Sequence, residues 1–290
     1  PHESDTRFQK MRSELAELVD ILSLEQIELN LFRGTSPTEG WQRVYGGQVL
    51  GQALVAASRT VDGDNRSAHS LHGYFLRPGD TSQPILYSVD RIRDGRSFTT
   101  RRVVAIQNGV AIFSMSASFQ VHETGLSHAD AMPDVPPPEN CEPMMHLLSD
   151  EAGGKRSWPI DMRSVEPVAR DQKPTPQPPV QHTWVRTVGE PPDDLRLNQC
   201  VLAYASDMTL LDTSYRPHGV DWTAGNFQVA SLDHAMWFHR PFQLDDWLLY
   251  AQDSPNSGGG RGFSRGTFFS RSGELIASVA QEGLIRLHAN

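Results

Sequence analysis

Three polar side chains stand where the sequence otherwise predicts burial. Asp207 ends an apolar run with helical spacing, Ser231 begins a strand-like segment, and Gln281 lies among small apolar residues near the C-terminus. A carboxylate at the C-terminal end of a helix faces partial negative charge, which costs roughly 0.3–1 kcal/mol. Burial costs more unless each polar group is hydrogen-bonded. Residues that break local rules in this way are often functional.

Together, the three groups would suit a site that activates water. The carboxylate of Asp207 would accept a proton, while the hydroxyl of Ser231 and the amide of Gln281 would orient the water molecule. A solvated helix end for Asp207 and a strand-edge hydroxyl for Ser231 are the structural alternatives.

The chain repeats one module. Residues 74–78, Tyr-Phe-Leu-Arg-Pro, match residues 237–241, Trp-Phe-His-Arg-Pro, at an offset of 163. Later matches keep this register within two residues. A similarity that holds one register over roughly fifty residues indicates a duplication.

The polar residues are confined to the second copy. Small apolar residues, Ala56 and Ala57, stand near the position of Asp207 in the first copy, and Ala117 stands opposite Gln281. A packing role shared by both copies would not produce this difference, which therefore favours function.

Each copy predicts the same order of elements, in which two short strands precede a helix and a run of antiparallel strands follows it. The helices, residues 49–57 and 195–205, are apolar around most of their circumference and are therefore expected to be buried. A curved antiparallel sheet wrapped around each helix satisfies this order, so we predict an α+β tandem hot-dog fold. The predicted strands are 27–33, 41–45, 69–76, 84–93, 98–107 and 111–121 in the first copy, and 160–168, 182–188, 229–239, 247–252, 263–269 and 275–286 in the second.

The predicted domain organisation has three parts. Residues 1–128 form the N-terminal unit, led by an amphipathic helix with Phe8, Met11, Leu15, Leu18 and Leu22 on one face. Residues 129–159 are rich in proline and glycine and are predicted to be a linker. Residues 160–290 form the C-terminal unit, with Asp193 as a helix N-cap and an extra loop over 210–226.

Composition excludes several classes of protein. A net charge of −9 over 290 residues argues against nucleic-acid binding. No apolar run approaches the length of a membrane span, and no secretory signal is seen at the start. The two cysteines, Cys141 and Cys200, form neither a disulfide framework nor a metal-binding spacing. We expect a cytoplasmic protein without metal or cofactor.

Two further motifs are weighed and set aside. Residues 262–266 match the G-x-S-x-G nucleophile elbow around Ser264, but that motif needs an Asp or Glu and then a His after the serine on an α/β sheet. The only His that follows is His288, two residues from the end, and both flanks predict strand or turn. The glycine run over 258–262 is not followed by a helix, so it predicts a loop between strands rather than a phosphate site.

Ordered blocks along nearly the whole chain resemble the acyl-CoA thioesterase II family. The blocks are 31–34, 45–48, 69–79 and 105–109 in the first copy and 204–207, 232–242 and 281–283 in the second. The resemblance implies a double hot-dog fold that hydrolyses acyl-CoA to free acid and coenzyme A. It also implies a water held by an Asp, a Thr or Ser, and a Gln, which fall here on Asp207, Ser231 and Gln281. Many members of the family have Thr where this chain has Ser231.

The resemblance also implies a homo-oligomer, a dimer or tetramer of chains, and no bound metal or cofactor. Weaker predictions for substrate binding are His234, His72, Gly46, Gly47, Arg96 and Arg261, and Arg91, Arg93 and Arg265 are further candidates for the CoA phosphates.

Two rival functions are a hot-dog enoyl-CoA hydratase and a non-catalytic acyl-CoA-binding protein. The hydratase would need a Gly-Asp-x-Asn-Pro-x-His segment, which the sequence lacks. The binding protein would tolerate replacement of Asp207.

Overall fold

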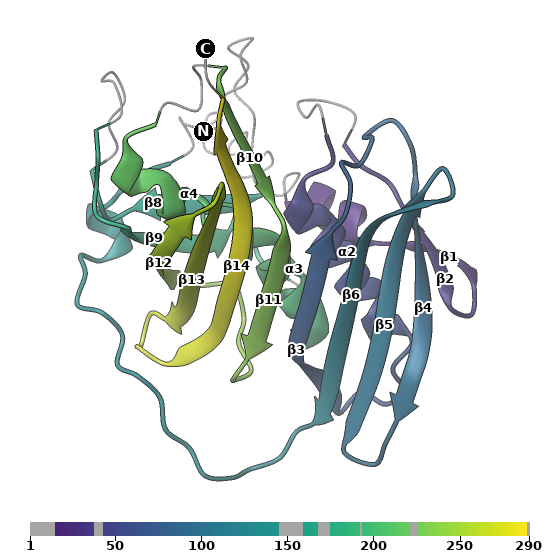
Figure 1. Cartoon of the computed structure of the whole chain (residues 1–290). Coiled ribbons are helices and arrows are strands. Elements are labelled where there is room, and N and C mark those ends of the chain that lie inside the picture. The colour runs from purple at the N-terminus through teal and green to yellow at the C-terminus, as the bar shows by residue number, and fades with distance from the viewer. Residues whose placement is uncertain are drawn as a thin grey trace, which may run out of the picture.

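A computed structural model describes residues 15–37, 43–144, 159–167, 175–191, 193–220 and 225–288. Within these ranges the strands form one antiparallel sheet of 14 strands. The strands of the first half lie side by side with those of the second half, and helices α2 and α3 lie behind them in the view of Figure 1.

The elements of the first half are β1 (Glu25–Glu28), β2 (Leu31–Gly34), α2 (Gly46–Arg59), β3 (Arg66–Phe75), β4 (Ile85–Asp94), β5 (Phe98–Gln107) and β6 (Val110–Val121). Those that follow are η1 (Pro138–Asn140), β7 (Glu142–Pro143), β8 (Ile160–Ser164), β9 (Val180–Thr187), α3 (Leu195–Ser206), α4 (Asp212–Tyr215), η3 (Arg216–His218), β10 (Phe227–Ser231), β11 (Asp233–Phe238), β12 (Leu248–Gly258), β13 (Arg261–Ser270) and β14 (Leu275–Leu287).

The order of strands across the sheet confirms that the chain is a duplication. It runs β1-β2-β4-β5-β6-β3-β11-β14-β13-β12-β9-β8-β7, so each half repeats the other from the central β3–β11 pair outward. In that pair His72 lies opposite Ala235, and these positions differ by the sequence offset of 163. Two hot-dog units are therefore related by a pseudo-twofold axis through the middle of the sheet.

The two helices are buried because apolar residues cover most of their circumference. In α2 every residue from Gly47 to Ser58 is buried, and in α3 every residue from Asn198 to Ser206. The helices approach closely because two glycines of α2 face α3. A Cβ added to Gly47 would lie 2.3 Å from the carbonyl oxygen of Tyr204, and one added to Gly51 would lie 3.1 Å from that of Cys200. The N-terminus of α2 therefore meets the C-terminus of α3.

Several predicted boundaries in the first half were wrong. The strand predicted over 27–33 is a hairpin, with a turn between β1 and β2. Gly46 and Gly47 do not break a strand but form the first turn of α2, where glycine permits close packing. Of the predicted strand 41–45, only 43–45 are described, and they are not in a strand. Residues 15–22 are helical as predicted, while Phe8 and Met11 lie outside the described residues.

The second half also differs from the prediction at three places. The segment 229–239 is divided at Leu232 into β10 and β11, because the carboxylate of Asp233 accepts the Glu282 N–H at 2.7 Å and interrupts the ladder. The N-cap of α3 is Asp194 rather than Asp193, since the Asp194 side chain accepts from the N–H groups of Arg196 and Leu197. The predicted loop 210–226 contains α4 and η3.

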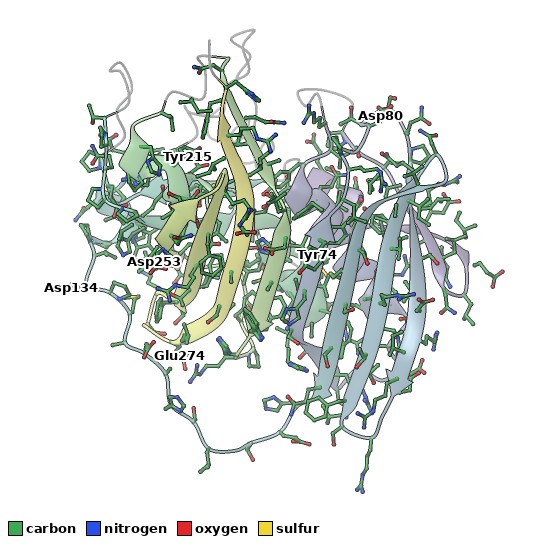
Figure 2. The ribbon with its side chains drawn as sticks, viewed as in Figure 1. Tyr74, Asp80, Asp134, Tyr215, Asp253 and Glu274 are labelled. Atoms are coloured by element: carbon green, nitrogen blue, oxygen red, sulfur yellow. The ribbon has the colours of Figure 1, made fainter. Side chains whose placement is uncertain are left out.

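The stretch predicted to be a linker contributes to the sheet. Strand β7 falls within 129–159 and pairs with β8 at the outer edge. In Figure 2 the segment that carries Asp134 crosses below the sheet from one half to the other. No helix in the described part of the chain is long and apolar enough to span a membrane.

Candidate active site

The structure brings Asp207, Ser231 and Gln281 into mutual contact. Asp207 is the C-cap of α3, Ser231 ends β10, and Gln281 lies on the inner face of β14. The Asp207 Oδ1 atom lies 3.0 Å from Ser231 Oγ and 2.9 Å from Gln281 Nε2, and the last two atoms are 2.6 Å apart. The side chains of Asp207 and Gln281 are buried, and Ser231 is partly exposed.

The direction of each hydrogen bond in this triangle follows from the donors available. An ionised carboxylate only accepts, so the Ser231 hydroxyl and one amide hydrogen of Gln281 both donate to Asp207. The second amide hydrogen donates to Ser231 Oγ. Within the triangle, Asp207 Oδ2 and one lone pair of Ser231 are not used. A carboxylate oxygen has more than one acceptor site, so a water molecule could donate to Asp207 and to Ser231.

The N-terminus of α2 holds the same carboxylate from the other unit. Tyr45 is the N-cap of α2 but provides no side-chain acceptor, and the Gly47 N–H instead donates to Asp207. The first N–H groups of a helix lack partners within it and carry partial positive charge. A Cβ on Gly46 would lie 2.6 Å from Asp207 Oδ2, so only glycine lets the carboxylate come this close.

Two tyrosines bind the carbonyl groups at the end of α3. The Tyr45 hydroxyl donates to the Tyr204 carbonyl at 2.9 Å, and the Tyr250 hydroxyl donates to the Ser206 carbonyl at 2.8 Å. These bonds reduce the negative field that the helix end directs at Asp207. The unfavourable position of the carboxylate is thus offset by donors on α2, β12 and β14. Tyr45 lies in the resemblance block 45–48, but no local pattern gave either tyrosine this role, because both contacts are long-range.

Burial makes Asp207 a stronger base than an exposed aspartate. Loss of solvation raises its pKa from 3.8 to about 6, while the hydrogen bonds from Ser231, Gln281 and Gly47 lower it. The charge of Asp212 on α4 raises it further. Burial likewise raises the pKa of Asp212 to about 6, and the Tyr215 hydroxyl bonds its carboxylate at 2.6 Å.

His234 contacts Gln281 and Ser206 through its two ring nitrogens. Its Nδ1 atom is 3.0 Å from Gln281 Oε1, and its Nε2 atom is 2.9 Å from Ser206 Oγ. The ring is fully buried, which lowers its pKa to about 4 and keeps it neutral. The distance from Nδ1 to Asp207 Oδ1 is 4.0 Å, so the two side chains are neighbours without a hydrogen bond.

The structure does not bring the other candidates into the triangle. His72 is exposed on the outer face of β3, with its ring edge-to-face against Trp237. Arg96 lies in the β4–β5 hairpin, where its carbonyl accepts from Arg66 at the other end of the helix pair. Arg261 lies at the start of β13 and pairs with Glu282 at 2.9 Å.

Arg261 is nevertheless at the same end of the sheet as the triangle, because the neighbouring Gly262 pairs with Gly283, and Gly283 pairs with Ser231. Of the further arginine candidates, Arg91 donates to Asn30, and Arg265 pairs with Asp253.

In the first unit, a different residue stands at the position that corresponds to Asp207. The C-cap of α2 is Thr60, so Thr60 and not Ala56 or Ala57 corresponds to Asp207. Ala117 pairs with Arg101 as Gln281 pairs with Ser264. The fully buried Arg101 guanidinium donates to Thr60 Oγ1 at 2.8 Å and to the Thr60 carbonyl at 3.0 Å. A cation therefore stands at the end of α2, where the second unit has a carboxylate at the end of α3.

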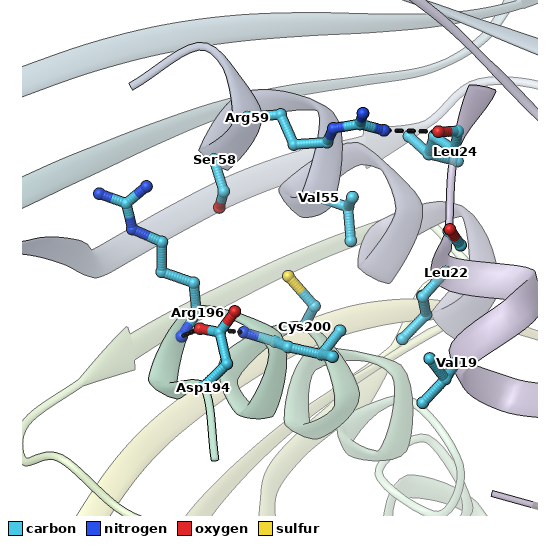
Figure 3. Close-up of a pocket in the computed structure, with 11 residues that line it drawn as sticks. Val19, Leu22, Leu24, Val55, Ser58, Arg59, Asp194, Arg196 and Cys200 are labelled. Atoms are coloured by element: carbon cyan, nitrogen blue, oxygen red, sulfur yellow. Dashed lines mark hydrogen bonds between the residues drawn. The ribbon is translucent and has the colours of Figure 1, made fainter. Parts of the chain in front are cut away.

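A cavity of about 380 Å³ lies at the other end of the helix pair, where the C-terminus of α2 meets the N-terminus of α3 (Figure 3). Two of its polar side chains are already bound: Arg59 donates to the Leu24 carbonyl, and Asp194 caps α3. The cavity contains none of the predicted site residues. Among the described residues, no group of three or more His, Cys, Asp or Glu side chains is placed to hold a metal ion.

In the described part of the chain, fold and site together define a double hot-dog protein with a polar site where the N-terminus of α2 meets the C-terminus of α3. A protein with the hot-dog fold from Alicyclobacillus acidocaldarius superimposes with a TM-score of 0.75 at 18% identity, covering 94% of this chain and 99% of that one. The models of the acyl-CoA thioesterase N-terminal domain and of acyl-CoA thioesterase match residues 35–120 and 157–284.

The chain belongs to the acyl-CoA thioesterase family. It is 40% identical to acyl-CoA thioesterase 2 of Haemophilus influenzae, over 94% of this chain and 98% of that protein. Acyl-coenzyme A thioesterase 8 of Rattus norvegicus is 42% identical, over 93% and 88% of the two chains. An acyl-CoA thioesterase II from Mycobacterium marinum superimposes with a TM-score of 0.78 at 46% identity, over 94% and 99%. The chain is accordingly a thioester hydrolase (EC 3.1.2), which sets the hydratase and the non-catalytic binding protein aside.

Proposed function

We propose that the chain hydrolyses fatty acyl-CoA to free fatty acid and coenzyme A by direct attack of water, without an acyl-enzyme. The observation that carries the proposal is the hydrogen-bonded triangle of Asp207, Ser231 and Gln281, in which the carboxylate and the hydroxyl each keep capacity to accept another hydrogen bond. A water that donates one hydrogen to Asp207 Oδ2 and the other to Ser231 Oγ keeps a lone pair for the thioester carbon. Such positioning removes much of the entropy cost of the attack.

In the proposed mechanism Asp207 takes a proton from the water and later gives it to the leaving group. Asp207 accepts one proton from the water as its oxygen bonds to the carbonyl carbon, and a tetrahedral intermediate forms. Collapse of that intermediate breaks the carbon–sulfur bond, and the departing CoA thiolate takes the proton from Asp207. The products are the carboxylic acid and the CoA thiol, and Asp207 returns to its ionised form. Its pKa of about 6 suits both steps at neutral pH.

The first turn of α2 is the candidate for binding the oxyanion. The carbonyl oxygen gains negative charge during the attack, and N–H groups at a helix N-terminus stabilise such charge. The Gly47 N–H already holds Asp207, so the reacting groups and this turn lie together.

Release of free thiol from a panel of acyl-CoA esters tests the proposal. The wild-type chain should release CoA, and Asp207→Asn should lose about 10²–10⁴-fold in kcat, the contribution of a general base. The panel also ranks acyl chain lengths. Near-equal rates for wild type and variant would show that the base lies elsewhere.

The chain is further proposed to form a homo-oligomer, a dimer or tetramer. Tyr74 and Leu76, which are 63% and 48% exposed, present apolar surface near the junction of the two halves. Tyr74 projects from this face in Figure 2. Light scattering on the purified chain gives its mass, and Tyr74→Glu should lower that mass if this face pairs.

A further inference from the structure

Three buried side chains form a line behind the proposed water site. Ser206 ends α3, His234 lies on β11, and Gln281 lies on β14, and their exposed fractions are 0%, 0% and 1%. The His234 ring bridges the other two, with Nε2 2.9 Å from Ser206 Oγ and Nδ1 3.0 Å from Gln281 Oε1. The line therefore runs from the last turn of α3 to the amide that contacts Asp207.

The tautomer of His234 follows from its partners. Both amide hydrogens of Gln281 are used, toward Asp207 and toward Ser231, so the amide oxygen is the atom that faces the ring. An oxygen needs a donor, so the Nδ1 atom carries the hydrogen. A neutral ring has only one N–H, so Nε2 accepts from the Ser206 hydroxyl. The Ala203 carbonyl, 2.9 Å from Ser206 Oγ, is a second acceptor for that same hydrogen.

The two ends of a glutamine amide have nearly the same shape, so packing alone does not fix its orientation. A rotated Gln281 would place its oxygen against the Asp207 carboxylate and would deprive Ser231 of a donor. The Nδ1–H group of His234 prevents this rotation, because a buried amide oxygen without a donor is costly.

We propose that His234, supported by Ser206, is a positioning residue that fixes the Gln281 amide with both hydrogens toward Asp207 and Ser231. This assignment rests on the proposed function of the Gln281 amide in holding the attacking water. It replaces the prediction that His234 lines the substrate site. Both ring nitrogens are engaged within the protein, so His234 is neither the base nor a nucleophile.

The first unit provides an internal comparison. The offset of 163 places Leu71 at the position of His234, and Leu71 is likewise fully buried, on β3. Ala117, at the position of Gln281, has no amide to orient. The unit without the glutamine therefore also lacks the histidine, although its scaffold packs a leucine there. The histidine is therefore found in the unit that has the glutamine amide, and packing of the sheet does not require it.

The test compares His234→Leu, which imports the residue of the first unit, with His234→Asn, whose amide nitrogen can replace the Nδ1–H donor. We expect His234→Leu to lower kcat about 10–100-fold with KM nearly unchanged, and His234→Asn to recover most of the loss. In a Gln281→Ala background, His234→Leu should cost nothing more, because its effect passes through the amide. Full activity of His234→Leu, or an equal additional loss in the Gln281→Ala background, would overturn the proposal.

The ¹⁵N resonances of the ring provide a readout that needs no turnover and no folded leucine variant. We expect the Nδ1–H tautomer in the wild-type chain at neutral pH, and a loss of that preference in Gln281→Ala. An Nε2–H tautomer in wild type would overturn the assignment of His234. A wild-type chain that releases no thiol would instead overturn the proposed function, so the two failures are distinguishable.

Discussion

Replacement of Asp207 by asparagine should make the protein less active and more stable at the same time. Burial raises the pKa of Asp207 from 3.8 to about 6, so the folded chain binds this proton more tightly than the unfolded chain does. Ionisation at neutral pH therefore opposes folding. A difference of about 2 pH units corresponds to about 3 kcal/mol, at about 1.4 kcal/mol for each unit.

The sign and the pH window follow from these two values. Below pH 3.8 the carboxyl is protonated in both states, and its charge costs the fold nothing. The cost grows as pH rises from 3.8 toward 6 and is complete above that. It amounts to about 1.6 kcal/mol at pH 5 and about 3 kcal/mol at pH 7.5. The neutral amide of the Asp207→Asn variant avoids this cost but weakens the bond from the Gly47 N–H, which offsets about 1 kcal/mol at either pH.

Urea unfolding of wild type and Asp207→Asn at the two pH values measures this difference. The variant should be more stable by about 2 kcal/mol at pH 7.5, and its advantage should shrink by about 1.4 kcal/mol at pH 5. The exposed Asp134→Asn is the matched control and should leave stability and thiol release unchanged. A stability difference that is the same at both pH values would refute the reasoning, because no shifted ionisation would then be present.

Three further predictions concern the surroundings of the carboxylate. In wild type, kcat/KM should fall as pH drops through about 6, and Asp212→Asn should move that fall to lower pH, because a like charge near Asp207 is removed; an unmoved profile contradicts the coupling. Gly46→Ala should lower kcat at least tenfold, since its Cβ would lie 2.6 Å from Asp207 Oδ2, whereas Gly125→Ala, with open space around it, should match wild type in the thiol assay. Arg101→Met should lower the free energy of unfolding by about 2–4 kcal/mol while kcat per folded molecule stays unchanged, and a loss of kcat with normal stability would place Arg101 in the site instead.

Local signals predicted the strands well where turn chemistry defines their ends. Strand β5 has the predicted bounds, Phe98–Gln107, because Asn108 and Gly109 adopt the left-handed conformations that this hairpin turn requires, with φ of 49° and 75°. The N-terminus of α2 was misplaced because glycines in its first turn imitate a strand break. Their reason for being there, contact with Tyr204 and Asp207, is tertiary and cannot be read from neighbouring residues.

The repeat alone could have shown that His72 and His234 do not both face the helices. Both His72 and His234 stand beside aromatic residues, but the offset of 163 equates His72 with Ala235, the residue next to His234. Adjacent residues of a strand point to opposite faces of the sheet, so at most one of the two could face the helices. The structure places His234 there and leaves His72 on the outer face.

The antiparallel pair of helices explains why, among the described residues, the proposed water site lies in one unit and has no counterpart in the other. A water-activating carboxylate at a helix C-cap needs a neighbouring helix N-terminus to stabilise it, and the partner helix provides this at each end of the pair. At one end Asp207 of α3 meets Gly47 of α2. At the other end Thr60 ends α2, and the guanidinium of Arg101 donates to its hydroxyl and carbonyl oxygens. Placing a carboxylate at position 60 alone would therefore create an ion pair with Arg101 rather than a base, so the first unit can gain the chemistry only if both positions change together.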